Sequence, residues 1–198
     1  WAGGVKFART GGEANALSLR IARAFIKKNK VAVCGYHGWH DWYLSSNLNN
    51  ENSLDPHLLK NLRIDGVPKS LKGTTYTFEY NDFEKLKKIV NENNIGIIKM
   101  EVERNEKPKN DFLKKIRKLA TSKNIVLIFD ECTSGFRETY GGLHLKYKIN
   151  PDIVILGKAL GNGYAINAVL GKREIMQSCQ KTFISSTFWT EKIGNVAA

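Results

Sequence analysis

The sequence is poor in cysteine and has no long apolar run. Its three cysteines, Cys34, Cys132 and Cys179, are an odd number and show no CxxC spacing. This argues against a disulfide scaffold or a cysteine zinc site and favours a reducing, cytoplasmic compartment. No window reaches the roughly 18 consecutive apolar residues of a membrane-spanning helix. The chain begins at Trp1 with no basic-then-apolar leader, and its first residues resemble mid-domain sequence, so we expect a fragment of a longer protein.

Acidic residues are also scarce. The 31 Lys and Arg residues outnumber the 19 Asp and Glu residues, which gives a net charge of +12. Such an excess raises the hypothesis of a nucleic-acid-binding module. The basic residues at 85–88 and 114–118 recur at helical spacing, however, and this favours solvated helix faces and no nucleic-acid partner.

Short apolar runs alternate with helical patterns along the whole chain. Hydrophobic residues make up 42% of the 198 residues, enough for a packed core. The runs predicted as strands are 31–35, 95–102, 125–129, 153–156 and 168–170. Runs this apolar are typical of strands covered on both faces, so we predict an α/β fold with a mostly parallel sheet and helices on both faces. Residues 45–75 are polar and are predicted to form a surface excursion.

Two glycine-containing segments are candidates for ligand binding. Gly11 and Gly12 precede a helical pattern, where free backbone N–H groups favour an anion such as phosphate, although an ordinary helix entry has the same pattern. Tyr36 and His37 follow an apolar strand, where an aromatic ring can stack on a planar ligand. His37 and His40 are spaced as a metal pair, but no third ligand is evident, so we expect no metal; a packed aromatic turn is the alternative.

Two charged residues follow neighbouring strands further along the chain. Asp130 ends a very apolar strand, where a carboxylate is placed to meet a ligand. Lys158 lies between another apolar strand and a glycine-rich turn. Desolvation there makes an amine nucleophilic, as Schiff-base chemistry requires, whereas a lysine that snorkels to solvent is the simpler alternative. An amine, an acid, an anion cradle and a stacking ring are together what pyridoxal 5'-phosphate needs from a protein.

These segments resemble the class III aminotransferases, which are pyridoxal-phosphate enzymes of fold type I, and especially the branch named glutamate-1-semialdehyde 2,1-aminomutase-like. The stretches that carry the resemblance are FARTGGEANA, CGYHGWHDWYLSSNL, LIFDECTSGFR, DIVILGKALGNGY and SSTFWTE. The resemblance implies that residues 1–198 form the large, cofactor-binding domain, incomplete and without the family's N-terminal segment and C-terminal small domain.

The resemblance also implies roles for individual residues. Lys158 is expected to bind the cofactor covalently and Asp130 to pair with its pyridine nitrogen. Gly11 and Gly12 are expected to hold the phosphate. The resemblance further implies that Tyr36 stacks on one face of the cofactor ring with His37 beside it, and that Thr133 lies against the other face. Glu101 is expected to support the site from behind these residues, and Thr187 is also expected to bind the cofactor.

Thr187 matches a threonine that reaches the phosphate of the neighbouring subunit, which implies a homodimer. A local turn is the alternative explanation for its hydroxyl. Gly12 stands where the family has Ser or Thr, so one hydroxyl contact to the phosphate is lost.

The expected reaction is amino-group transfer between a small-molecule amino donor and a carbonyl acceptor. Transamination of a keto acid or keto sugar and the aminomutase reaction both stay open. A catalytically silent fragment of such an enzyme is the alternative.

Overall fold

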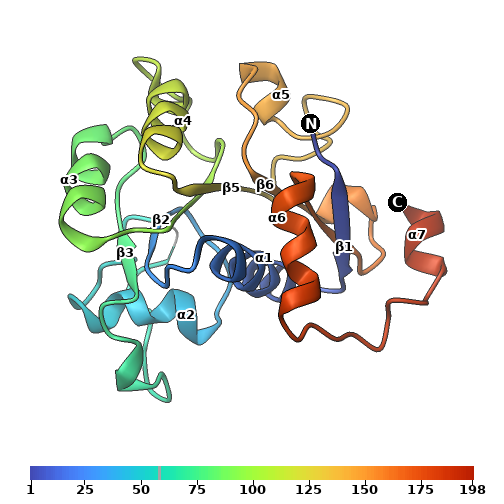
Figure 1. Ribbon diagram of the computed structural model, residues 1–198, viewed down its shortest axis with the longest axis horizontal. Helices are drawn as coiled ribbons and strands as arrows, with labels where there is room; N and C mark the ends of the chain where they lie inside the picture. Colours follow the sequence, from blue (N-terminus) through green and yellow to red (C-terminus); the bar gives the residue numbers. More distant parts are fainter. Residues whose placement is uncertain (58) are drawn as a thin grey trace.

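The computed structural model describes residues 1–57 and 59–198, which form a three-layer α/β arrangement around a seven-stranded sheet (Figure 1). The strands are β1 (Gly4–Ala8), β2 (Val31–Cys34), β3 (Thr75–Thr77), β4 (Ile97–Glu101), β5 (Val126–Glu131), β6 (Ile153–Leu156) and β7 (Asn167–Gly171). They lie in the order β1-β7-β6-β5-β4-β2-β3. Strands β3, β2, β4, β5 and β6 are parallel, and β7 runs antiparallel to both β6 and β1. The predicted mostly parallel sheet is confirmed.

Helices cover both faces of the sheet, as the sequence predicts. Helices α3 (Phe83–Asn93), α4 (Phe112–Ser122) and α5 (His144–Tyr147) lie on one face, and α1 (Gly11–Ile26), α2 (Asp41–Leu44) and α6 (Arg173–Met176) lie on the other (Figure 1). The shorter elements are η1 (Ser45–Leu48), η2 (Lys69–Leu71), η3 (Lys158–Leu160), η4 (Gln177–Lys181) and α7 (Ile193–Ala197). Each face of the sheet therefore has its own buried apolar cluster.

Local sequence signals explain where the helices begin and end. Thr10 caps α1, because its hydroxyl accepts the Glu13 N–H at 3.2 Å, and α1 ends at Lys27 in the left-handed region. Asp82 caps α3 by accepting the Lys85 N–H at 2.9 Å. On α3 and α4 the buried side chains share one stripe, and most of the lysines lie on the exposed side.

The predicted surface excursion at 45–75 is partly wrong. Ser45, Leu54 and His57 are buried, and the stretch leads into β3, which the apolar pattern does not reveal. Residue 58 of this stretch lies outside the described residues. Strand β1 was also not predicted, because its Gly4–Ala8 sequence mixes glycine, lysine and apolar residues and pairs at the edge of the sheet.

Candidate active site

The predicted residues gather at the carboxyl-terminal edge of the sheet. Gly11 follows β1, Tyr36 follows β2 and Lys158 follows β6, whereas Glu101 and Asp130 are in β4 and β5. Glu101 and Asp130 are side-by-side partners in the parallel register. Strand β1 runs in the same direction as β6, because β7 is antiparallel to both. All five segments therefore open toward one edge, where α/β folds place their ligands.

Asp130 is buried at this edge and is held by His37. The Asp130 Oδ2 lies 2.8 Å from His37 Nδ1, and Oδ1 accepts the Cys132 N–H at 3.2 Å. Burial opposes the charge of Asp130, but the hydrogen bond from His37 and the nearby positive charge of Lys99 hold the pKa of the carboxyl well below its usual range. Asp130 is therefore an ionised carboxylate. The Asp130 side chain is only 4% exposed. A carboxylate at the end of a strand is usually more accessible to solvent.

The His37 ring is buried. It is 1% exposed, stacks near Trp42 and approaches the Cys34 carbonyl oxygen through Nε2 at 3.2 Å. Its Nδ1–H donates to the Asp130 carboxylate in the neutral ring as well as in the charged ring. The geometry thus makes His37 a residue that orients Asp130.

Glu101, at the end of β4, forms a hydrogen bond with the turn that follows β2. Its Oε2 accepts the Tyr36 N–H at 3.0 Å, and its Oε1 accepts from Arg104 Nε at 2.8 Å. Burial raises the pKa of Glu101 to about 7, although Arg104 opposes the shift. A Cβ on Gly35 would lie 2.5 Å from Glu101 Oε2, and Gly35 has a φ of +105°, so this position needs glycine.

Lys158 is exposed, as expected for the alternative in which the side chain snorkels to solvent and not for a buried amine. It directly follows β6 and Gly157, and its φ of 45° is in the left-handed region that only a few non-glycine residues adopt. Its Nζ donates to Thr133 Oγ1 at 2.8 Å, and Arg104 Nη2 donates to the same oxygen at 3.4 Å. Two cations therefore converge on the Thr133 hydroxyl.

The start of α1 leaves backbone donors free. Thr10 satisfies the N–H groups of Glu13 and Ala14 through its hydroxyl and its carbonyl oxygen. Within 1–57 and 59–198, neither Gly11 nor Gly12 has a hydrogen-bond acceptor for its N–H. Because a helix N-terminus favours negative charge, these two groups are suited to an anion.

Thr187 is exposed. The neighbouring Phe188 ring packs under Arg9, with 4.3 Å between the guanidinium carbon and the ring centroid. Arg9 also pairs with Glu191 at 3.4 Å, and Glu191 accepts backbone N–H groups at the start of α7. The segment that carries Thr187 is thus anchored next to β1.

Four residues of the site were not predicted from the sequence. Arg104 follows β4 by a few residues, Asn167 bonds the Arg9 carbonyl oxygen from β7, and His57 Nδ1 accepts the Gly35 N–H at 2.6 Å. Lys99 is fully buried within β4 and donates to Ser18 Oγ at 3.1 Å. Lys99 could have been found as the single charge within the apolar run 95–100, whereas the other three depend on tertiary contacts.

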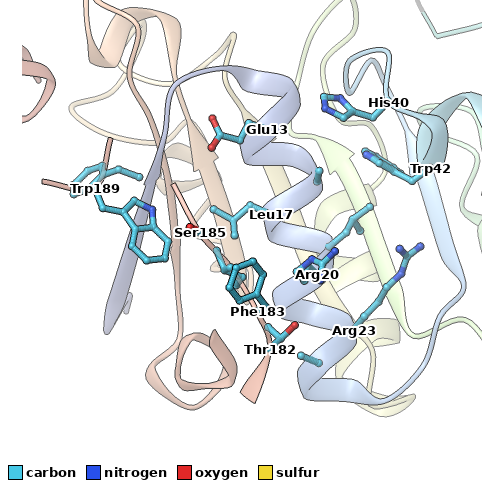
Figure 2. A pocket seen from close by; sticks show the side chains of 15 residues that line it. Glu13, Leu17, Arg20, Arg23, His40, Trp42, Thr182, Phe183, Ser185 and Trp189 are labelled. Atoms are coloured by element: carbon cyan, nitrogen blue, oxygen red, sulfur yellow. The ribbon is translucent and has the colours of Figure 1, made fainter. Parts of the chain in front are cut away.

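A groove of about 760 Å³ runs along the outer face of α1, next to this edge (Figure 2). It is lined by residues of α1, by His40 and Trp42, and by the segment 182–189, including Phe183 and Trp189. Lys158 and Asp130 do not line it. Across the described ranges, no group of three or more His, Cys, Asp or Glu side chains is arranged to hold a metal ion. No helix among these residues is long and apolar enough to cross a membrane.

The structure is thus an α/β domain with a mostly parallel sheet, and it has a lysine and a buried carboxylate at one edge of that sheet. The sequence pattern of the family described as Aminotransferase class-III matches residues 4–198. The chain therefore belongs to the class III aminotransferases.

Several known proteins resemble the chain over almost its whole length. It is 38% identical to the 3-aminobutyryl-CoA aminotransferase of Cloacimonas acidaminovorans, over 96% of this chain and 44% of that protein. It is 36% identical to the glutamate-1-semialdehyde 2,1-aminomutase of Sulfolobus acidocaldarius, over 93% and 45% respectively. The chain thus spans slightly less than half the length of these relatives.

Solved structures show the same fold. An omega-transaminase from Sphaerobacter thermophilus superposes with a TM-score of 0.84 at 22% identity, over 99% of this chain and 48% of that one. A structure described as a transaminase with PLP bound gives a TM-score of 0.83 at 22% identity, over 98% and 47%. The ornithine aminotransferase of Toxoplasma gondii gives 0.79 at 26% identity, over 99% and 48%.

Proposed function

We propose that this chain is the cofactor-binding large domain of a pyridoxal-phosphate-dependent enzyme that transfers amino groups. The observation that carries the proposal is the meeting of Lys158, Asp130 and Tyr36 with the free N–H groups of Gly11 and Gly12 at one sheet edge. Family membership supports it, as do relatives named as an aminotransferase and an aminomutase. When bound, pyridoxal phosphate supplies an aldehyde for a Schiff base and a ring that withdraws electrons.

The arrangement of residues fits that cofactor. The ionised Asp130 is suited to pair with a protonated ring nitrogen, because both charges stabilise each other in a site with little water. His37 keeps the carboxylate oriented through its Nδ1–H. The N–H groups of Gly11 and Gly12 are placed to bind the phosphate.

Lys158 and Thr133 supply the groups that move or hold a proton. We assign Lys158 as the covalent attachment site, because its amine is exposed at the edge and bonded to one hydroxyl. Thr133 accepts from this amine at 2.8 Å and so directs it. Glu101 holds the Tyr36 backbone, which fixes the ring that would stack on the cofactor.

Thr187 is assigned to the site of a second subunit in a homodimer. Its exposure supports a role outside its own site. The substrates are a small-molecule amino donor and a carbonyl acceptor, either a keto acid or keto sugar or, as in an aminomutase, the two ends of one molecule.

The test is a titration of the whole protein that contains this chain with pyridoxal phosphate. We expect a shifted absorption band that Lys158→Ala abolishes and Lys88→Ala leaves unchanged. Lys88 is a suitable control because it lies exposed on α3. Absence of any band in the wild-type protein would contradict the proposal. A band with no amino transfer, neither to a keto acid or keto sugar nor between the two ends of glutamate-1-semialdehyde, would instead identify a catalytically silent member of the family.

A further inference from the structure

Tyr43 of α2 is a buried tyrosine whose hydroxyl is bonded to the turn that follows β2. Its side chain is 1% exposed. The hydroxyl donates to the Gly35 carbonyl oxygen at 2.8 Å. Burial raises the pKa of Tyr43 well above its usual range, so the hydroxyl keeps its proton and stays a donor. A buried phenol usually finds one hydrogen-bond partner, and here the partner is the residue directly before Tyr36.

The Tyr43 ring also contacts two residues that are expected to bind the cofactor. Its centroid lies 6.1 Å from that of Tyr36, with the two planes at 88°, and 5.7 Å from that of His37, with the planes at 82°. Edge-to-face pairs at such distances are favourable beyond the area that they bury. Tyr43 therefore supports both the ring predicted to stack on the cofactor and the imidazole that orients Asp130.

The backbone of the turn is held by side chains from separate segments. The Gly35 N–H donates to His57 Nδ1 at 2.6 Å, and the Gly35 carbonyl oxygen accepts from Tyr43. The Tyr36 N–H donates to Glu101 at 3.0 Å. Gly35 has a φ of +105°, and glycine is the residue with the most backbone freedom, so contacts from outside the turn are needed to keep it in one conformation. Tyr43 adds ring contacts to its backbone bond and so holds the turn and its side chains together.

We propose that Tyr43 is a positioning residue of the cofactor site, which holds the Tyr36 ring and the His37–Asp130 pair at a set angle to each other before the cofactor binds. The inference rests on the proposed function, since it concerns the geometry of the same site. A pyridine ring must meet the stacking ring with its face and the carboxylate with its nitrogen at the same time, so both contacts depend on this angle. Such preorganisation raises affinity although Tyr43 itself does not touch the ligand.

The first experiment compares Tyr43→Phe with Tyr80→Phe in the whole protein. Tyr43→Phe removes the hydroxyl and keeps the ring. Tyr80→Phe is the matched control, because the Tyr80 hydroxyl also donates to a backbone carbonyl oxygen, that of Val102, and Tyr80 packs in the apolar cluster on the other face of the sheet. We expect Tyr43→Phe to weaken pyridoxal phosphate by about fivefold, the factor for one lost hydrogen bond, and to reduce the circular dichroism of the cofactor band. Tyr80→Phe should change neither.

A double-mutant cycle with Tyr36→Leu separates positioning from general destabilisation. If the Tyr43 hydroxyl acts through Tyr36, Tyr43→Phe should have no further effect on cofactor affinity once Tyr36 is leucine. Losses that multiply in the double variant would overturn the inference, because they would show an effect independent of the stacking ring. Unchanged affinity in Tyr43→Phe alone would also overturn it.

A measurement without cofactor distinguishes failure of this inference from failure of the proposed function. Hydrogen exchange of the peptide that contains Gly35 and Tyr36 is followed by mass spectrometry. We expect Tyr43→Phe to speed the exchange of this peptide by about fivefold and Tyr80→Phe to leave it unchanged. Equal exchange in the wild-type protein and Tyr43→Phe would contradict the positioning role. If the wild-type protein bound no pyridoxal phosphate but the exchange responded as expected, the proposed function would fail and the positioning of the turn by Tyr43 would stand.

Discussion

Lys99 offers a quantitative test of the energetics of this fold. Its side chain is fully buried between β4 and α1, with Ser18 Oγ as a hydrogen-bond partner and the Trp42 ring 5.9 Å away. Burial lowers the pKa of Lys99 from 10.5 to about 8, although the negative charge of Asp130 opposes the shift. The charged amine therefore destabilises the folded state at neutral pH.

The magnitude follows from linkage. The unfolded chain binds a proton on Lys99 more tightly than the folded chain does, so stability rises with pH between about 8 and 10.5. At about 1.4 kcal/mol per pKa unit, the cost is roughly 3 kcal/mol at pH 7 and under roughly 1 kcal/mol at pH 10. Lys99→Met removes this charge and should thus stabilise the protein at pH 7. The gain is smaller than the roughly 3 kcal/mol cost by about 1 kcal/mol, because the hydrogen bond to Ser18 is lost.

Urea unfolding of the wild-type protein and Lys99→Met at several pH values is the assay. We expect the gain from Lys99→Met to shrink by about 2 to 3 kcal/mol between pH 7 and pH 10. Lys88→Met, at an exposed position, should show no such trend. A variant that is less stable than wild type at pH 7, or a gap that does not change with pH, would refute the reasoning.

Three further outcomes are expected. Burial lowers the pKa of His57 to about 4, so the free energy of unfolding of the wild-type protein should fall by up to roughly 3 kcal/mol as the pH drops from 6.5 to 4. Acid unfolding of His57→Gln should show most of this fall removed. An identical fall in the variant would contradict this prediction. Asp130→Asn should still bind pyridoxal phosphate, but the rate of its half-reaction should fall at least about tenfold, because an amide carries no charge to hold the ring nitrogen protonated. Stopped-flow absorption measures this rate. An unchanged rate would exclude the role of Asp130 at the ring nitrogen. Thr187→Val should weaken cofactor binding by about tenfold. Hybrid dimers of one Thr187→Val subunit and one Lys158→Ala subunit should recover normal cofactor affinity at one of their two sites. No recovery in verified hybrids would rule out a role of Thr187 across the subunit boundary.

The sequence predicts the framework because its signals are local. Strand β6 is predicted with its observed bounds, Ile153–Leu156, because a run this short, rich in β-branched residues and bounded by turn residues favours a buried strand. The edge strands β1 and β3 were missed, because their pairing with β7 and β2 compensates for a weak apolar pattern. Tertiary contacts override local propensity at such positions.

The sequence predicts which residues lie at the same edge of the sheet, but not how deeply each side chain is buried or what it contacts. Asp130 is predicted to face a ligand, and this stays a prediction; its burial and its hydrogen bond to His37 are visible only in the structure. For Lys158 the sequence left both a desolvated amine and a solvent-exposed one open, and the structure shows the exposed one, hydrogen-bonded to Thr133. The contacts of His57 and Arg104 come from segments whose sequences carry no motif, so they needed coordinates.

The most direct test of the account is the site of covalent attachment. The whole protein is loaded with pyridoxal phosphate, reduced with borohydride, digested and mapped by mass spectrometry. The account predicts the phosphopyridoxyl group on Lys158, in the peptide that follows β6. A label on Lys99, the buried lysine near Asp130, or on any other lysine in place of Lys158 would contradict it.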